Sequence, residues 1–251
     1  MIGDFLSGAG YFFQGLRIVR QKGVRPFVLM PLLVNFLVFA AAILIAIDQY
    51  GNLLGWLLPG GDSWWAEFAR IALWIFFAAA ALTVLFFTFT LVANVIGAPF
   101  NGLLSEKVEL ILAGAEGKEP AMSGGFFSTI IPSIASEFRK LSYFLVLAAL
   151  LVLLTLVPLV NVVSPFLWFA FSSWMLAVEY LAYPMENHDI YFSQVKARLR
   201  QDRWAALGFG MGCLVVGMVP VVNFFIMPAA VAGATAMWVE RLSRMGSENG
   251  R

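Results

Sequence analysis

The chain has 251 residues, of which 61% are hydrophobic and 12% are charged, and its mean hydropathy is +0.85. A chain this apolar is not a water-soluble globular protein, and we predict an all-α integral membrane protein. The net charge of +1, with basic residues scattered along the chain, argues against nucleic-acid binding. Because Cys213 is the single cysteine, a disulfide within the chain and a thiolate metal cluster are both excluded, and no cofactor is expected. Residues 1–4 carry an acid and no basic residue, so we expect no cleaved signal peptide.

The N-terminal segment predicts an amphipathic helix that lies at the membrane interface. From Phe5 to Arg20 the apolar residues roughly follow helical spacing, and polar residues such as Gln14 and Arg17 interrupt them. Three glycines within this segment should weaken the helix.

The stretch Lys22-Gly23-Val24-Arg25-Pro26 places two cations and a glycine directly before the first long apolar run. Proline suits the first helical position, so we expect a helix to begin at Pro26, with unpaired N–H groups facing an incoming anion. The guanidinium of Arg25 can bind two oxygens of a tetrahedral dianion at once. The alternative is a basic flank at a membrane boundary, which requires no bound anion.

Two uncharged runs are long enough to be full transmembrane helices, and we place the spans at residues 26–47 and 71–97. At 1.5 Å per residue, the ~22 residues of the first span reach about 33 Å, enough to cross the hydrocarbon core. Residues 48–70 between them contain glycines, acids and tryptophans. They predict an acidic, aromatic-rich loop at an interface.

Polar and small residues recur on one face of the second span and of its continuation: Thr83, Thr90, Asn94, Gly97 and Asn101. This stripe either lines a polar path or packs against neighbouring helices. We expect residues 94–102, which include Gly97 and Pro99, to break the helix, and we expect it to restart at Leu103. Beyond the break, Glu106 and Glu109 flank Lys107, and they form either a charged gate at a pore mouth or a solvated helix end.

The same short phrase interrupts the two C-terminal apolar runs, as Val157-Pro-Leu-Val-Asn161 and as Val219-Pro-Val-Val-Asn223. Each arm has ~15 to 17 uninterrupted apolar residues, or roughly 22 to 26 Å, which is short of the ~30 Å core. We therefore predict partly penetrating helical hairpins at residues 141–181 and 204–240, with Pro165 and Pro228 restarting the second helix of each. Duplicated broken helices point to a transporter's central site. Two ordinary hairpins of thin spans are the alternative.

The segment between the hairpins contains the single histidine, His188, beside Asn187 and Asp189. Without a second histidine or a nucleophile motif, enzyme activity and a zinc site are disfavoured, and a structural or gating hydrogen bond is expected.

Further on, glycines at 208, 210 and 212 predict close helix contact, either within a hairpin or between subunits. If both hairpins return to the side they entered, every Lys and Arg except Arg70 lies on one face, which we expect to be cytoplasmic.

Three phrases together resemble the CysZ family of bacterial sulfate permeases: residues 97–109 (GAPFNGLLSEKVE), 179–188 (EYLAYPMENH) and 223–238 (NFFIMPAAVAGATAMW). The likeness runs from about Phe12 to Glu240. It implies sulfate uptake across the bacterial inner membrane, feeding sulfur assimilation and cysteine biosynthesis. It also implies a homo-oligomer whose subunit is one transport domain, residues 1–251, with two full spans and two partly penetrating hairpins.

The resemblance places the sulfate site on Gly23, Val24 and Arg25, beside which Lys22 supplies a further cation. The family often has a second arginine at the next position, where this chain has Pro26, so one cationic side chain and one backbone donor are missing. The resemblance also assigns polar and charged residues to a conduction path or gate: Asn94, Asn101, Glu106, Glu109, Asn187 and His188. Two alternatives stay open, namely transport of another oxyanion such as sulfite, thiosulfate or molybdate, and a membrane scaffold that conducts nothing.

Overall fold

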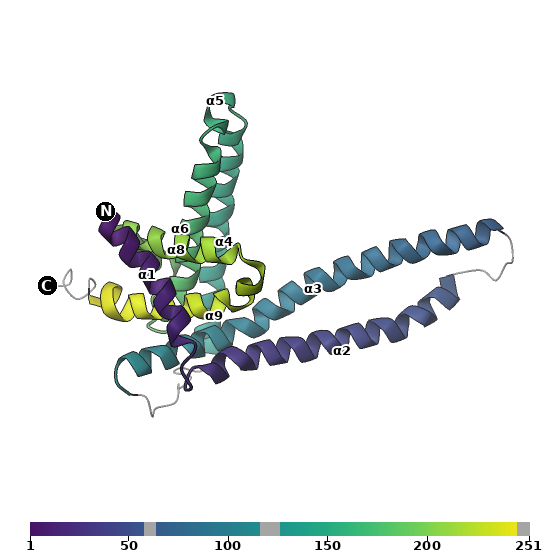
Figure 1. Cartoon of the computed structure of the whole chain (residues 1–251), viewed down its shortest axis with the longest axis horizontal. Coiled ribbons are helices and arrows are strands. Elements are labelled where there is room, and N and C mark those ends of the chain that lie inside the picture. The colour runs from purple at the N-terminus through teal and green to yellow at the C-terminus, as the bar shows by residue number, and fades with distance from the viewer. Residues whose placement is uncertain (58–63, 116–125, 245–251) are drawn as a thin grey trace. The chain divides into compact units, whose positions relative to one another are not determined.

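The computed structural model describes residues 1–57, 64–115 and 126–244, and the regular elements in these ranges are all helices. They are α1 (Ile2–Ile18), α2 (Arg25–Leu57), α3 (Trp64–Leu112), α4 (Phe126–Thr155), α5 (Pro158–Asn161), α6 (Ser164–Glu186), α7 (Phe192–Gln201), α8 (Arg203–Gly217), α9 (Pro220–Met237) and the π-helix η1 (Trp238–Leu242) (Figure 1). The prediction of an all-helical protein is therefore confirmed for these ranges.

The chain divides into two compact units. One unit consists of Met1–Val28 and Asn101–Arg251, and it contains α1 and the helices from α4 onward. The other, Leu29–Phe100, contains most of α2 and α3. All but one of the residues assigned above to the candidate site and path belong to the first unit, and the exception is Asn94.

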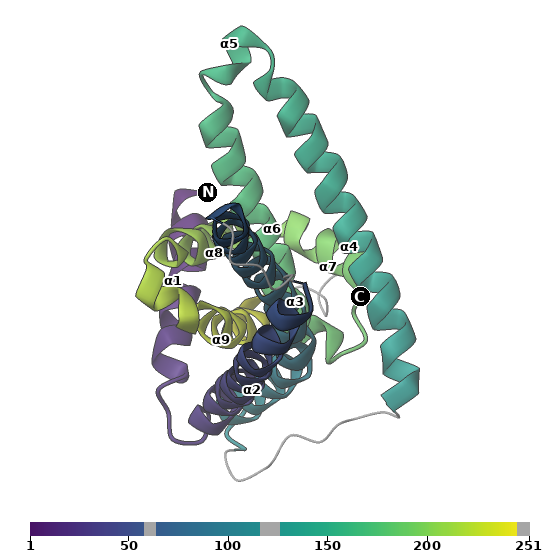
Figure 2. The same ribbon diagram turned by 90° about the vertical axis from the view of Figure 1, so that its right-hand side faces the viewer.

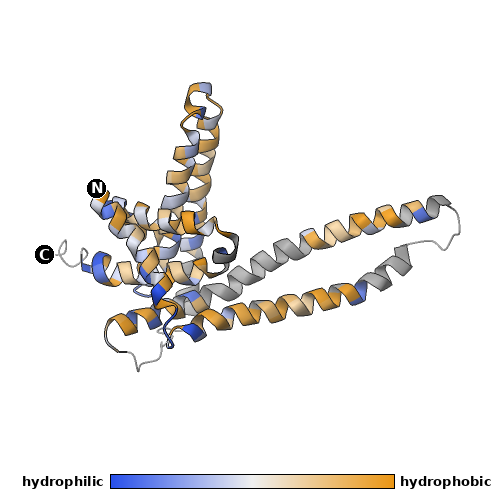
Figure 3. Ribbon diagram, in the orientation of Figure 1, coloured by the Kyte–Doolittle hydropathy of each residue, from blue (hydrophilic) through white to orange (hydrophobic). Residues whose placement is uncertain are grey.

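Three helical segments of the described chain are long and apolar enough to cross a membrane: Arg25–Gln49, Ala135–Thr155 and Ser164–Glu186. The first lies in α2 and includes the predicted span 26–47, and hydrophobic residues cover most of its length (Figure 3). A shorter apolar segment, Ile71–Thr83, opens the predicted span 71–97 within α3. Large apolar side chains such as Phe36 and Leu44 are exposed on α2, as expected for a surface in contact with lipid.

Two predicted interruptions of the long helices are absent from the described residues, so these predictions are wrong. α2 continues to Leu57 and α3 starts at Trp64, so the expected loop at 48–70 is helical at both ends, and its residues 58–63 lie outside the described ranges. The glycines there cost only about 1 kcal/mol each relative to alanine, which does not end a helix that long apolar flanks propagate. α3 also passes through Pro99 without a break. A proline removes one hydrogen bond, and the turns on both sides keep theirs.

Both repeated phrases end a helix, as predicted. α4 ends at Thr155 before Pro158, and α8 ends at Gly217 before Pro220. The residue before each proline is extended, with φ −83° and ψ 118° at Val157 and φ −87° and ψ 111° at Val219. This conformation is the one that a following proline favours. The first break forms a hairpin of α4 and α6 with α5 at its tip (Figure 2).

The two second prolines behave differently. Pro165 lies in the first turn of α6, so the predicted restart there is confirmed. Pro228 lies inside α9, so the predicted restart at this residue is wrong. The turn that follows Pro228 packs directly on α1, since a Cβ at Gly15 would lie 2.0 Å from the Ala229 carbonyl oxygen. This packing stabilises α9 at the position where Pro228 removes a backbone hydrogen bond.

α1 packs on α8 and α9 with backbone against backbone. A Cβ at Gly8 would lie 2.0 Å from the carbonyl oxygen of Ala205, and one at Gly208 would lie 1.9 Å from that of Phe5. Glycines in α1 and α8 therefore permit an approach that any side chain would block. Gly210 does the same between α8 and α6, where a Cβ would lie 1.8 Å from the Ser173 carbonyl oxygen. The predicted close helix contact of these α8 glycines is confirmed, but its partners are α1 and α6 rather than the other helix of the hairpin.

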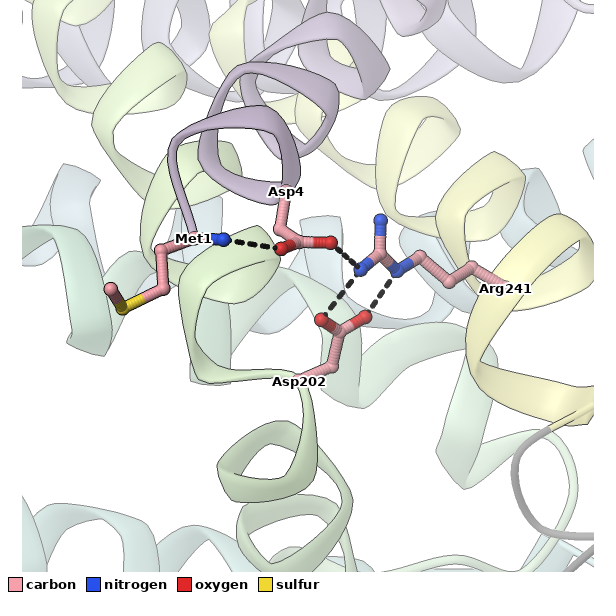
Figure 4. A network of polar contacts seen from close by, with 4 residues as sticks. All are labelled: Met1, Asp4, Asp202 and Arg241. Atoms are coloured by element: carbon pink, nitrogen blue, oxygen red, sulfur yellow. Dashed lines mark hydrogen bonds and ion pairs between the residues drawn. The ribbon is translucent and has the colours of Figure 1, made fainter.

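A charged cluster joins the start of α1, the junction of α7 with α8, and η1 (Figure 4). The Nη2 of Arg241 donates to Asp4 Oδ1 and to Asp202 Oδ1, both at 2.8 Å, and its Nε donates to Asp202 Oδ2. The amino group of Met1 donates to Asp4 Oδ2 at 2.9 Å. Asp202 is buried, so its carboxylate depends on Arg241 for compensation of its charge.

Arg241→Ala should lower the free energy of unfolding by about 2 kcal/mol, because it leaves the buried carboxylate of Asp202 without its charged donor. The measurement is thermal unfolding of the detergent-solubilised full chain. Arg17→Ala is the control, because Arg17 is an exposed cation at the end of α1. Equal melting temperatures for the two variants would contradict the importance of the cluster.

The same cluster predicts a dependence of stability on pH. The hydrogen bond from Arg241, together with the amino group of Met1, lowers the pKa of Asp4 from 3.8 to about 2. A carboxylate with a lowered pKa stabilises the folded state above its ordinary pKa, and this contribution is lost as the pH falls toward about 2. The melting temperatures of wild type and Asp4→Asn should therefore differ most above pH 3.8 and converge toward about pH 2. A difference that stays constant over this window would contradict the assignment.

Candidate functional site

The candidate oxyanion site is the turn between α1 and α2. Val24 is fully buried, whereas Lys22, Gly23 and Arg25 are exposed. α2 begins at Arg25, one residue before the predicted start. The N–H groups of Val24 and Arg25 both donate to the Gln21 carbonyl at 3.1 Å. These two donors are therefore occupied, contrary to the expectation of unpaired N–H groups at the helix start.

The side chain of Arg25 is held in place by its own turn. Its Nε donates to the Arg20 carbonyl at 2.8 Å, which leaves both terminal guanidinium nitrogens for an external acceptor. Within the described ranges no carboxylate forms an ion pair with Arg25 or Lys22. The turn thus presents a planar fork of donors beside a point charge, the two kinds of cation that bind oxyanions.

The end of α3 lies against this turn. A Cβ at Gly23 would lie 3.9 Å from Ile111 Cδ1, in ordinary van der Waals contact. α3 ends one residue later, and the chain turns at Gly114, whose φ of 75° favours glycine. The last turn of α3 also carries Glu109, so the candidate oxyanion site and one of the candidate gate residues belong to neighbouring segments of one unit.

Glu109, Asn187 and His188 come together where α3 meets the end of α6. The Nε2 of His188 lies 2.9 Å from Glu109 Oε1 and 3.1 Å from its Oε2. Asn187 Nδ2 donates to the Gly102 carbonyl at 3.1 Å. The expected hydrogen bond of His188 is thus present, and the acid that receives it comes from α3. Asp189, its neighbour in sequence, accepts a hydrogen bond from Tyr191 at 3.2 Å instead.

Two residues that were not predicted as site residues extend this cluster. The Trp238 ring centroid lies 5.5 Å from that of His188, and the Arg198 guanidinium carbon lies 5.2 Å from the Trp238 ring. Trp238 is the first residue of η1, and Arg198 belongs to α7. Three helices, α3, α7 and η1, and the turn after α6 therefore supply a cluster of one acid, one imidazole, one indole and one guanidinium. Little in the sequence predicted this cluster. Trp238 is only the last residue of the stretch 223–238 that resembles the family, and Arg198 is one of several basic residues in its segment.

The other candidate path residues lie in or near α3. Asn101 is 5% exposed, and its Nδ2 has no hydrogen-bond partner within the ranges that the structure describes. Lys107 is 3% exposed, so the segment from Glu106 to Glu109 is not the uniformly solvated helix end that was the alternative to a gate. Glu106 is partly buried. Asn94 lies within α3, and its side chain lies outside the described part of the structure.

A double-mutant cycle on Glu109 and His188 should give a coupling free energy of about 0.5–1.5 kcal/mol, the usual net value of a partly exposed hydrogen bond. The measurement compares the unfolding free energies of Glu109→Ala, His188→Ala and the double variant. The matched control is a cycle on Asp189 and His188, which should show no coupling because Asp189 bonds to Tyr191. Coupling in the control cycle alone would contradict the observed pairing.

Comparison with known proteins decides the family. The family model described as Sulfate transporter CysZ/Etoposide-induced protein 2.4 matches residues 11–228. The chain belongs to this family. The matched stretch contains the turn from Lys22 to Arg25 and the Glu109–His188 pair, whereas Trp238 lies beyond it. The resemblance to the CysZ family seen in the three phrases is thereby confirmed.

Curated relatives cover nearly the whole chain. "Sulfate transporter CysZ" of Pseudomonas paraeruginosa is 43% identical over 234 residues, which is 93% of this chain and 95% of the relative. The protein of the same name in Pseudomonas fluorescens (strain Pf0-1) is 43% identical over 245 residues, covering 97% and 96% of the two chains. That of Vibrio atlanticus is 40% identical over 238 residues, covering 93% and 92%. These members of the CysZ family are named as transporters, in agreement with the prediction that the chain is not an enzyme.

Proposed function

We propose that the chain carries sulfate across the bacterial inner membrane as a permease or channel and so supplies sulfur assimilation and cysteine biosynthesis. Membership of a family whose matching relatives are named sulfate transporters supports this substrate. The observation that carries the proposal is the exposed guanidinium of Arg25, which the Arg20 carbonyl fixes through Nε. A fixed fork of donors suits a tetrahedral dianion.

Sulfate binds first at the turn from Lys22 to Arg25. The terminal nitrogens of Arg25 contact two sulfate oxygens, and the Lys22 ammonium adds charge without fixed geometry. The backbone of Gly23 and Val24 holds the turn and permits close approach of the anion. Because the cations are exposed, sulfate keeps part of its hydration and binding is modest, which permits release into a path.

The path itself is assigned to the conduction residues predicted from the sequence: Asn94, Asn101, Glu106, Glu109, Asn187 and His188. A carboxylate repels a dianion, so Glu109 serves as a gate rather than as a binding group. Its hydrogen bond with His188 supports this role, because it ties the carboxylate to the segment after α6, so that a movement of this segment would move the negative charge. The uncompensated amide of buried Asn101 is a donor suited to an anion on its way.

The proposed membrane arrangement has two full spans, at 26–47 and 71–97, and two partly penetrating hairpins, at 141–181 and 204–240. α4 and α6 are long enough to cross, so the tip of their hairpin is the more informative feature. Leu159 at this tip is 88% exposed, and Leu156 and Val162 are exposed beside it. A complete crossing would place these side chains in water, whereas partial penetration keeps them in hydrocarbon. α8, with 15 residues, reaches only about 22 Å, short of the ~30 Å core.

The subunit is proposed to act as a single transport domain, residues 1–251, in a homo-oligomer whose basic face is cytoplasmic. Every Lys and Arg except Arg70 lies on that face if both hairpins return to the side they entered. Labelling of single introduced cysteines from each side of intact inner-membrane vesicles tests the orientation. Labelling of residues 196 and 250 from opposite sides would overturn it.

The function is tested by uptake of radiolabelled sulfate into proteoliposomes that contain only this protein. Wild type should exceed empty vesicles, and unlabelled sulfate should compete better than sulfite, thiosulfate or molybdate. Preferential competition by one of these would assign that oxyanion as the substrate. Uptake equal to that of empty vesicles by folded protein would favour the scaffold alternative.

A further inference from the structure

α7 lies at the level where the hydrocarbon of the membrane ends. Lys140 and Glu179 form an ion pair at 2.9 Å between α4 and α6, and every residue from 141 to 178 is uncharged. On the other side of α7, Arg203 precedes an uncharged run from 204 to 239. α7 therefore connects two apolar stretches at their charged borders. This position is that of the lipid headgroups.

One face of α7 is fixed to the protein. Phe192, Val195 and Leu199 are buried, and the helix lies beside α4 and α6 (Figure 2). At its start, the Phe192 N–H donates to Ser136 Oγ at 3.1 Å, which ties the helix to the border of α4. The opposite face is thereby turned outward at a set angle.

Two cations, Lys196 and Arg200, stand one turn apart on one flank of α7. The Lys196 Nζ lies 4.8 Å from the Tyr143 ring centroid and 5.2 Å from that of Phe192. Tyr143 follows Lys140 by one turn, so it is the first aromatic residue on the apolar side of the border. Tyrosines in this position mark the interface between headgroups and acyl chains.

The acids near α7 are already engaged elsewhere. Glu137 and Glu179 both bind Lys140, Asp202 binds Arg241, Glu186 accepts a hydrogen bond from Ser136, and Asp189 accepts one from Tyr191. In the described chain, neither Lys196 nor Arg200 forms an ion pair with a carboxylate. This flank therefore carries two positive charges that an external anion can compensate.

We infer that Lys196 and Arg200 bind the phosphate of an anionic phospholipid such as phosphatidylglycerol. A soluble sulfate or phosphate ion has the same tetrahedral oxyanion chemistry. We assign the occupant to the lipid because Lys196 Nζ lies over the ring of Tyr143, at the border of the apolar part of α4. A phospholipid bound there would place its phosphate beside Lys196 and its acyl chains against the apolar side chains of α4. The site is independent of sulfate transport. It would seat the segment between the two hairpins on the membrane surface.

The test is native mass spectrometry of the detergent-solubilised full chain with added phosphatidylglycerol or phosphatidylcholine. Wild type should retain phosphatidylglycerol in preference to phosphatidylcholine. Because each basic residue near an anionic headgroup contributes about fivefold, Lys196→Gln/Arg200→Gln should weaken this retention about 25-fold. Lys196→Arg/Arg200→Lys should keep it, because this exchange preserves both positive charges.

Three results would overturn the inference. The first is equal retention of both lipids by wild type, and the second is unchanged preference in Lys196→Gln/Arg200→Gln. The third is displacement of the lipid by inorganic phosphate or sulfate at matched ionic strength, which would show a site for soluble anions. The melting temperature of each variant without added lipid confirms that the comparison is made between folded proteins.

Discussion

Arg25→Ala should lower sulfate uptake into proteoliposomes by about 10- to 100-fold at sulfate concentrations below saturation. Hydrogen bonds to charged groups contribute about 1.5–3 kcal/mol, and each 1.4 kcal/mol corresponds to a factor of ten. The loss should appear mainly in the apparent affinity, because Arg25 is proposed to bind the anion before it enters the path. Arg25 is exposed, so the melting temperature should change little.

Two further variants sharpen this experiment. Arg25→Lys keeps the charge but loses both the fork and the Nε bond to the Arg20 carbonyl, so it should fall between wild type and Arg25→Ala. Arg17→Ala removes an exposed cation at the end of α1 and should transport as wild type does. If Arg25→Ala matched wild type, the oxyanion site would be wrongly placed, and the segment from Asn94 to Glu109 would be the next candidate.

Gly8→Ala should lower the free energy of unfolding by about 2–4 kcal/mol. Its new Cβ would lie 2.0 Å from the carbonyl oxygen of Ala205 and 2.8 Å from its Cα. Because these are backbone atoms, no side-chain rotation relieves the clash, and α1 must move away from α8. α1 leads directly into the turn from Lys22 to Arg25, so sulfate uptake should fall as well.

Gly10→Ala is the matched control for this substitution. Gly10 lies in the same helix two residues later, and a Cβ there would meet nothing within 4 Å. Alanine should therefore stabilise the chain by up to about 1 kcal/mol through its helix propensity. The measurement is the fraction of protein that stays monodisperse after heating in detergent. Similar losses in both variants would show that helix propensity, and not close contact, decides the outcome.

Features set by neighbouring residues could be predicted from the sequence. The helix ends at Pro158 and Pro220 follow from the restriction that proline imposes on the residue before it, which is a local effect. Pro99 carries the same local signal, yet α3 passes through it. Whether a long helix tolerates one lost hydrogen bond depends on its surroundings, which a local pattern does not contain.

In the candidate site, too, the sequence predicted features that depend on neighbouring residues and missed those that depend on packing. The sequence predicted that Arg25 binds an anion, because a cation before a long apolar helix is a local pattern. It did not reveal that the Gln21 carbonyl occupies the N–H groups of Val24 and Arg25, since this depends on how the turn closes. The sequence also did not show which residue forms the hydrogen bond with His188. Glu109 lies 79 residues away, and only the packing of α3 beside α6 brings the two together.

The backbone contacts of α1 also bear on how this family can diverge. Main-chain atoms are the same in every residue, so a helix seated on them keeps its position when the outward-facing side chains change. The lipid-facing surfaces of α2 and of the α4–α6 hairpin can therefore accept many apolar residues. At Gly8, Gly15 and Gly208 hardly any replacement fits. The position of α1, and with it the start of the turn from Lys22 to Arg25, therefore depends on the residues with the smallest side chains.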